Sequence, residues 1–106
     1  MATSNDSLEF ILEQLSGVEG ITHRKMMGEY ILYLNGRIAA YLCDDRLLVK
    51  PVPVAVNMMP EAVYEPPYPG AKEMLLAENA DDPAFLKALF EAIYPELPEP
   101  KKRNKQ

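Results

Sequence analysis

The chain has 106 residues, of which 48% are hydrophobic and 25% are charged. This size and balance are typical of one globular domain with its own core, and they exclude a chain that is disordered throughout. The net charge is −5 at pH 7, which disfavours binding to a phosphate backbone except through a local basic patch.

The first predicted element is a helix between Asp6 and Gly17. Apolar residues recur there at helical spacing, at Leu8, Ile11, Leu12 and Leu15. Asp6 suits the N-cap position, with Glu9 three residues later as a variant of the capping box. Gly17 is a natural left-handed stop for the helix.

An antiparallel meander is predicted next, because short runs of branched and aromatic residues alternate with tight turns. The pair Asn35-Gly36 is the sharpest of these turn signals, since both residues tolerate a positive φ and suit a two-residue hairpin of type I′. Asp44-Asp45 marks a second tight turn. The predicted strands are Ile21–Met26, Tyr30–Leu34, Arg37–Cys43 and Arg46–Lys50.

Prolines interrupt the second half of the chain. Pro51 ends the meander because it cannot donate to a strand ladder, and a short helix is expected over Pro53–Met59. The proline-rich stretch Tyr64–Gly70 is expected to be extended or turned. We interpret it as a rigid loop rather than a proline-rich docking motif. A last strand is expected over Glu73–Ala77.

The final predicted helix starts at Asp82-Pro83, where the aspartate caps the helix and the proline takes the first helical position. Its apolar face is formed by Phe85, Leu86, Leu89, Phe90 and Ile93. Lys87 and Glu91 lie four residues apart on the other side, at the spacing of a helical ion pair.

The order of these elements predicts an α+β fold. A two-layer sandwich, with an antiparallel β-meander sheet and helices packed on one face, buries all of the apolar faces. We expect this domain to span residues 1–95. Residues 96–106 are expected to form a disordered basic tail that contains Lys101, Lys102, Arg103 and Lys105.

The sequence also bears on the compartment. Residues 1–6 have neither the basic region nor the apolar stretch of a signal peptide, and no apolar run approaches the roughly 20 residues that span a bilayer. Cys43 is the only cysteine, so the chain cannot form an internal disulfide. We therefore expect a cytoplasmic protein without membrane contact.

A run of residues around Gly28 carries a family resemblance. The stretch Arg24-Lys25-Met26-Met27-Gly28-Glu29-Tyr30-Ile31-Leu32-Tyr33 resembles the signature of the TfoX/Sxy N-terminal domain, and the similarity continues through Asn35-Gly36-Arg37, Asp44-Asp45 and Leu47-Leu48-Val49-Lys50. Two positions depart from the family pattern, because Met27 replaces an aromatic residue and Glu29 replaces a glycine. The resemblance implies a two-layer α/β sandwich and a role in transcriptional control of competence for DNA uptake.

Residues around Gly28 and at the end of one strand form the candidate partner-binding site: Arg24, Lys25, Gly28, Glu29, Tyr30 and Lys50. They predict a charged patch that meets an acidic ligand or partner. The alternative interpretation is a set of solvent-exposed strand ends with one salt bridge, which would contribute little to stability.

The final helix is the candidate dimer interface. Ala88, Ala92 and Tyr94 widen its apolar face beyond what one sheet contact requires, and spare apolar area often marks an interface. The residues expected to form the homodimer contact are Leu89, Phe90 and Ile93. The alternative is that the first helix and the proline-rich loop cover this face.

We do not expect an enzyme. His23 is the only histidine and Cys43 the only thiol, and each lies in a predicted strand without an evident catalytic partner. The sequence has neither the clustered spacing of a metal site nor a glycine-rich phosphate loop. No cofactor or metal is therefore predicted.

The leading hypothesis is a non-enzymatic regulatory domain that acts through a protein partner. Two alternatives stay open. Direct nucleic-acid binding would use Arg24, Lys25 and the basic tail. A small-ligand sensor or enzyme would use a cleft near Met27 and Tyr30.

Overall fold

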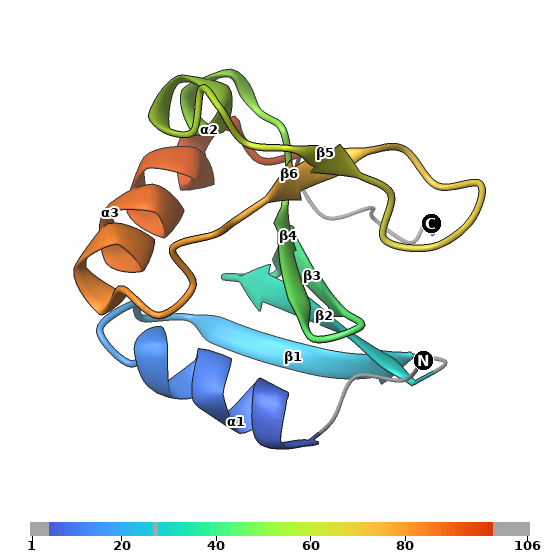
Figure 1. The fold of residues 1–106 in the computed structure, drawn as a ribbon. Coiled ribbons are helices and arrows are strands. Elements are labelled where there is room, and N and C mark those ends of the chain that lie inside the picture. Colours follow the sequence, from blue (N-terminus) through green and yellow to red (C-terminus); the bar gives the residue numbers. More distant parts are fainter. Residues whose placement is uncertain (1–4, 27, 99–106) are drawn as a thin grey trace, which may run out of the picture.

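A computed structural model gives the fold of the chain, and it describes residues 5–26 and 28–98 (Figure 1). Helices and strands follow one another in an order close to the predicted one. The elements are α1 (Asn5–Gln14), β1 (Ile21–Met26), β2 (Glu29–Leu34), β3 (Arg37–Cys43), β4 (Arg46–Val49), α2 (Pro53–Met58), β5 (Tyr64–Glu65), β6 (Met74–Leu76), α3 (Pro83–Ile93) and a short 3-10 helix (Tyr94–Glu96).

The strands form one open sheet in the order β1-β2-β3-β4-β6-β5, with every neighbouring pair antiparallel. The predicted meander is confirmed, since β1 and β3 have the predicted bounds and β2 and β4 differ by one residue at one end. Asn35 and Gly36 have φ angles of 51° and 85°. These positive values agree with the two-residue turn predicted between β2 and β3.

The far end of the sheet differs from the prediction. Residues Tyr64–Glu65 pair with β6 as a sixth strand, β5, where only an extended or turned stretch was expected. The pairing stops at once because Pro66 and Pro67 follow and cannot donate to a ladder. A strand of two residues carries too little alternation to be seen in a sequence.

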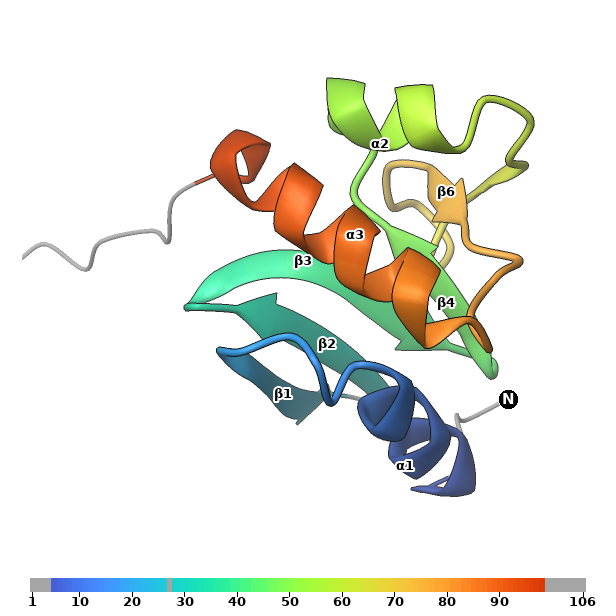
Figure 2. The same ribbon diagram turned by 90° about the vertical axis from the view of Figure 1, so that its left-hand side faces the viewer.

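All three helices pack on the same face of the sheet, which we call the inner face (Figure 2). Alternate residues of the strands point to this face, among them Leu32 of β2, Leu42 of β3 and Val49 of β4, and all are buried. They join apolar residues of α1, α2 and α3 in a single hydrophobic core. The predicted α+β class is confirmed.

The last helix begins as its sequence predicts. The Asp82 side chain accepts a hydrogen bond from the Phe85 amide at 3.1 Å, and Pro83 occupies the first turn. Lys87 and Glu91 form the expected ion pair at 3.9 Å. The first helix differs slightly, because it begins at Asn5 and places Asp6 inside its first turn instead of before it.

The regular fold continues past residue 95, where the domain was expected to end. The 3-10 helix Tyr94–Glu96 follows α3 directly, and Leu97 is buried in the core. Arg37 holds this segment in place, because its guanidinium donates to the carbonyls of Tyr94 and Leu97 at 3.4 and 3.3 Å. The predicted basic tail lies outside the described residues apart from residues 96–98.

Candidate functional site

Strand β1 forms one edge of the sheet, and it is largely open to solvent. β2 is its neighbour on one side, and no described strand pairs with the other side. Every residue of β1 after Ile21 is exposed. Figure 1 shows β1 at one end of the sheet beside α1, well away from β5 at the opposite edge. An open edge of this length is a template on which another strand can pair.

The free backbone groups of β1 can be assigned from its register. The Asn35 amide donates to the Gly20 carbonyl at 2.9 Å, just before the first paired residues, Ile21 and Leu34. Hydrogen-bonded and non-hydrogen-bonded pairs alternate along an antiparallel ladder. Gly20 and Asn35 are hydrogen-bonded to each other, so Ile21, His23 and Lys25 occupy non-hydrogen-bonded positions relative to β2. Their N–H and C=O groups therefore point away from β2, toward the open side.

The side chains of β1 alternate between the two faces of the sheet. His23 and Lys25 pair with Leu32 and Tyr30, which belong to the core, so they lie on the inner side. Arg24 lies on the opposite side, which we call the outer face. Met26 follows on the outer side, and it is 42% exposed.

The basic residues of β1 lack a counter-ion among the described residues, as Lys50 and Lys72 also do. Arg46 and Lys87 each form an ion pair with a glutamate, and Arg37 donates to backbone carbonyls. Within the described residues, the side chains of Arg24 and Lys25 make neither an ion pair nor a hydrogen bond. The edge therefore offers two uncompensated positive charges in a protein whose net charge is negative.

The turn after β1 is tied to the next turn at the same end of the sheet. Gly28 has a φ of 85°, which glycine adopts without strain. The Glu29 carboxylate accepts a hydrogen bond from the Asp44 amide at 3.1 Å, which joins this turn to the one between β3 and β4. Tyr30 is buried, and its ring meets the His23 ring edge to face with centroids 6.0 Å apart. Both Glu29 and Tyr30 thus support the end of the edge strand.

Lys50 lies apart from the other predicted site residues. It follows β4, whose last residue Val49 pairs with Ala40 in the middle of β3. The turn at Gly28 is at the opposite end of the meander, where β4 starts. The structure therefore brings Arg24, Lys25, Gly28, Glu29 and Tyr30 together around one end of β1 and leaves Lys50 outside that group.

Comparison with known proteins agrees with this fold reading. The sequence matches the model of the TfoX N-terminal domain over residues 13–92. The chain belongs to the TfoX N-terminal domain family. It is also similar to a protein of Spirochaeta aurantia described as "Uncharacterized 12.7 kDa protein in trpE 5'region", with 31% identity over 106 residues that cover 98% of this chain and 91% of the relative. No solved structure matches the chain.

The match to the TfoX N-terminal domain confirms the resemblance seen around Gly28. The matched range contains the whole sheet and ends one residue before the end of α3, so the open edge lies inside the family domain. Glu29, which departs from the family pattern, has the defined structural task of linking two turns in this TfoX N-terminal domain.

The predicted dimer residues are inside the TfoX N-terminal domain itself. Leu89, Phe90 and Ile93 are each 0% exposed in a single copy, because α3 packs on the sheet and α2 packs against α3. Their side chains are therefore not available to a second copy. The apolar residues of α3 are buried in the core of the domain itself. Homodimerisation stays a prediction, but Leu89, Phe90 and Ile93 cannot form its interface.

The outer face carries a smaller hydrophobic cluster, which the sequence did not suggest. Cys43, Leu48 and Met74 are buried there, with Tyr41 and Leu76 packed against them. Burial, with a contribution from the Glu29 carboxylate, raises the pKa of the Cys43 thiol from 9.0 to about 11. Burial also raises the pKa of Tyr41, with smaller contributions from Tyr68 and Tyr33. A protonated, buried thiol is a poor nucleophile.

A hollow of about 280 Å³ lies beside this cluster. Tyr41 and Lys50 line one side of it, the proline-rich stretch contributes Pro67 and Tyr68, and Lys72 lines it just after that stretch. The stretch predicted as a rigid loop therefore folds back over the outer face. Lys50, separated from the Gly28 turn, belongs to this hollow.

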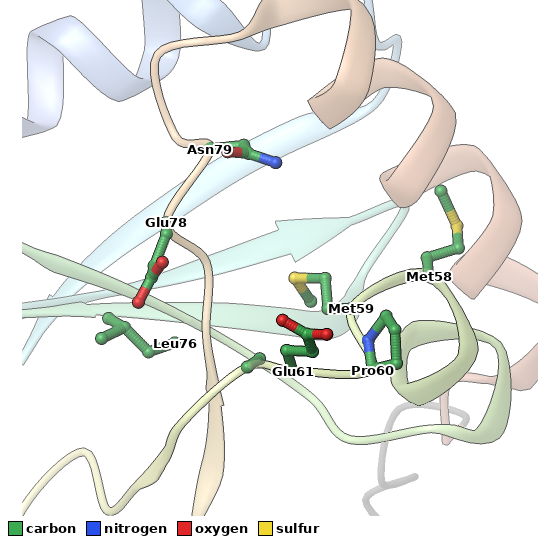
Figure 3. Close-up of a pocket in the computed structure, with 8 residues that line it drawn as sticks. Met58, Met59, Pro60, Glu61, Leu76, Glu78 and Asn79 are labelled. Carbon is green, nitrogen blue, oxygen red and sulfur yellow. The ribbon is translucent and has the colours of Figure 1, made fainter.

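A second hollow, of about 240 Å³, lies between the end of α2 and the segment after β6 (Figure 3). Its lining combines the side chains of Met58 and Met59 with the carboxylates of Glu61 and Glu78. Two like charges at one site favour a cation, but within the described residues no group of three acidic, histidine or cysteine side chains could hold a metal ion.

Some predicted site residues lie outside the described part of the chain. Met27, which the small-ligand alternative places in a cleft with Tyr30, is one of them, and Lys101, Lys102, Arg103 and Lys105 of the basic tail are the others. Among the residues that the structure describes, no helix is long and apolar enough to cross a membrane.

Proposed function

We propose that this TfoX N-terminal domain is a non-enzymatic interaction domain that binds a protein partner along the open edge of β1. The observation that carries this proposal is the edge itself. β1 is six residues long, has no described strand on one side and exposes all of its residues after Ile21. Partners commonly bind such an edge by adding a strand, because main-chain hydrogen bonds give affinity and alternate side chains give specificity.

The positions of the reactive side chains support binding rather than catalysis. Cys43 is buried on the outer face of β3, while His23 lies on the inner side of β1 with β2 between the two strands. A nucleophile and its base must lie within hydrogen-bond reach. His23 and Cys43 therefore have structural roles in this proposal, and binding is the function of the domain.

The regulatory setting of the proposal comes from the family. The TfoX resemblance implies control of competence or of transcription, and a domain that acts there without catalysis works by contacting a protein of that machinery. Arg24 and Lys25 are the residues proposed to select the partner, because they carry the two uncompensated charges of the edge.

The test is affinity capture from the native cytoplasm followed by reconstitution with the purified captured protein. The bait is the wild-type chain, the double variant Arg24→Glu/Lys25→Glu, or the control Lys72→Glu, which changes an exposed lysine far from β1. We expect the partner to bind wild type and control with similar Kd and to bind the double variant at least about tenfold more weakly. A protein retained equally by all three baits would contradict the proposal.

Direct nucleic-acid binding is an outcome that the same variants can detect. Arg24 and Lys25 point to opposite faces of the sheet, so they do not line one surface along which a phosphate backbone could run. We expect no salt-dependent binding of duplex DNA that the double variant abolishes. A steep loss of DNA affinity with salt and with these substitutions would favour nucleic acid instead.

A further inference from the structure

We infer that the partner segment bound by β1 is extended and acidic, and that it pairs antiparallel with β1 as a seventh strand. The inference rests on the proposed function and adds the chemistry of the partner. It follows from three features of β1, which are the direction of its backbone groups, the placement of its charges and the apolar residues at its two ends.

The backbone of β1 is already arranged for a further strand. Ile21, His23 and Lys25 direct their N–H and C=O groups to the open side, as the register with β2 requires. Each of these residues can therefore exchange two hydrogen bonds with a residue directly opposite on an added antiparallel strand. Arg24 and Met26 direct their backbone N–H and C=O groups to β2, so only their side chains can contact the added strand.

The charged side chains of β1 determine which residue types the added strand must place opposite them. Side chains of directly opposed residues lie about 4.5–5.5 Å apart at Cβ, and opposite charges at that distance stabilise the pair. Arg24 requires an acidic residue on the outer face, and Lys25 requires one on the inner side, next to it in sequence. His23 continues the inner row and accepts an acidic or polar residue.

The ends of β1 are apolar. Met26 is 42% exposed on the outer side, and Ile21 is half-buried against the core. Because the added strand runs antiparallel, its first residue faces Met26 and its last faces Ile21. The expected pattern is therefore apolar, acidic, acidic, acidic or polar, polar, apolar.

A second copy of the chain fits this edge poorly. β1 contains no acidic residue, so antiparallel pairing with a second β1 gives Arg24 and Lys25 no opposite charge and adds two further positive charges to the same edge, where like charges are destabilising. The other sheet edge, β5, has only two residues, which is too short to cover β1. Four of the chain's own residues 101–105 are basic and have the wrong charge. An acidic segment of another protein is the occupant that the charges select.

The experiment uses the full chain and a capped peptide with the central run Val-Glu-Glu-Glu-Thr-Val. Its control is the same peptide with glutamine in place of each glutamate. We expect binding of the acidic peptide in an NMR titration, with amide shifts concentrated at His23 and Lys25, slower amide exchange at these two positions, and affinity that falls with added salt. The glutamine peptide should bind roughly tenfold more weakly.

Two substitutions at one position separate the backbone from the charge. Lys25→Gln removes only the charge and should lower the affinity for the acidic peptide by a few-fold. Lys25→Pro also removes the outward N–H, and it should abolish binding while sparing the β1–β2 ladder, because a proline is tolerated where the N–H of an edge strand faces solvent. Circular dichroism checks that each variant is folded. If Lys25→Pro is unfolded, slower amide exchange at His23 and Lys25 in the wild-type complex is the test of whether the backbone of β1 pairs with the peptide.

Binding of the acidic peptide with shifts confined to α2 and α3, or equal affinity for both peptides, would overturn the inference. The proposed function fails separately. If neither peptide binds but a captured partner still loses affinity for the Arg24→Glu/Lys25→Glu variant, the edge is an interaction site whose partner is not an acidic strand. If that partner is also indifferent to the substitutions, the proposed function itself is wrong.

Discussion

The last helix and the first strand use their side chains in opposite ways. α3 places Leu86, Leu89, Phe90 and Ile93 fully inside the core, while β1 leaves everything after Ile21 exposed. α3 packs against the sheet, β1 is the edge strand of that sheet, and both have residues that sequence patterns single out. The difference shows that the apolar face of α3 stabilises the fold, whereas β1 contributes little burial and leaves its charged side chains exposed.

The largest effect expected from this comparison is at the centre of α3. Phe90→Ala removes a ring that is completely buried, and it should lower the free energy of unfolding by about 3–5 kcal/mol because the core loses apolar contacts and retains a cavity. Urea denaturation followed by circular dichroism measures the change. A loss below about 1 kcal/mol, within the range of surface substitutions, would contradict the assignment of this face to the core.

A pH-dependent effect is expected at the buried outer face. The pKa of Cys43 is raised to about 11, so between about pH 9 and pH 11 the unfolded chain releases a proton that the folded chain retains. This group stabilises the fold fully below pH 9, and its contribution of roughly 1–3 kcal/mol is lost as the pH rises through 11. Urea denaturation of wild type and Cys43→Ala from pH 8 to pH 11 should show the stability difference narrowing. A constant difference would mean that the thiol titrates alike in both states.

A smaller effect is expected at the start of α3. Asp82→Ala removes the hydrogen bond from the Phe85 amide and should destabilise the fold by about 1 kcal/mol, the usual cost of losing an N-cap. Asp82→Asn keeps an acceptor and should cost little, which makes it the matched control. Thermal denaturation of the two variants checks this, and equal losses would show that the cap is not what holds the helix start.

The smallest effect on stability is expected on β1. Lys25→Thr replaces an exposed residue that has no ion pair within the described part of the chain, so the free energy of unfolding should change by less than about 0.5 kcal/mol. The same variant should bind the acidic peptide more weakly. A large loss of stability would break the comparison, because it would assign Lys25 to the fold instead of to a partner.

The sequence predicted the meander well because its turns are chemically explicit. Asn35-Gly36 and Asp44-Asp45 both adopt positive φ, and each residue pair fixes where the two strands beside it meet and in which register they pair. The start of α3 was predicted for the same reason, since Asp82 and Pro83 are local signals. Where structure depends on a few neighbouring residues, the pattern is sufficient.

The sequence failed where burial depends on distant contacts. The apolar residues Leu89, Phe90 and Ile93 look alike whether a second copy or α2 and the sheet cover them, and only the fold shows that they are buried within one chain. Lys50 was grouped with Arg24 because both were expected near strand ends. The strand register places them at opposite ends of the meander. A sequence pattern alone does not show at which end of a sheet a residue lies.

The entry into β1 has a consequence for the proposed binding of a partner. An added Cβ at Gly20 would overlap the side-chain amide of Asn35. The backbone amide of Asn35 also donates a hydrogen bond to the Gly20 carbonyl. The start of β1 is therefore held in place by the β2–β3 turn within the domain itself. The ordering entropy of association, about 1–2 kcal/mol for each residue fixed, is then lost by the incoming segment alone. A partner that presents the same acidic sequence on a rigid, already folded edge should therefore bind more tightly than the free peptide.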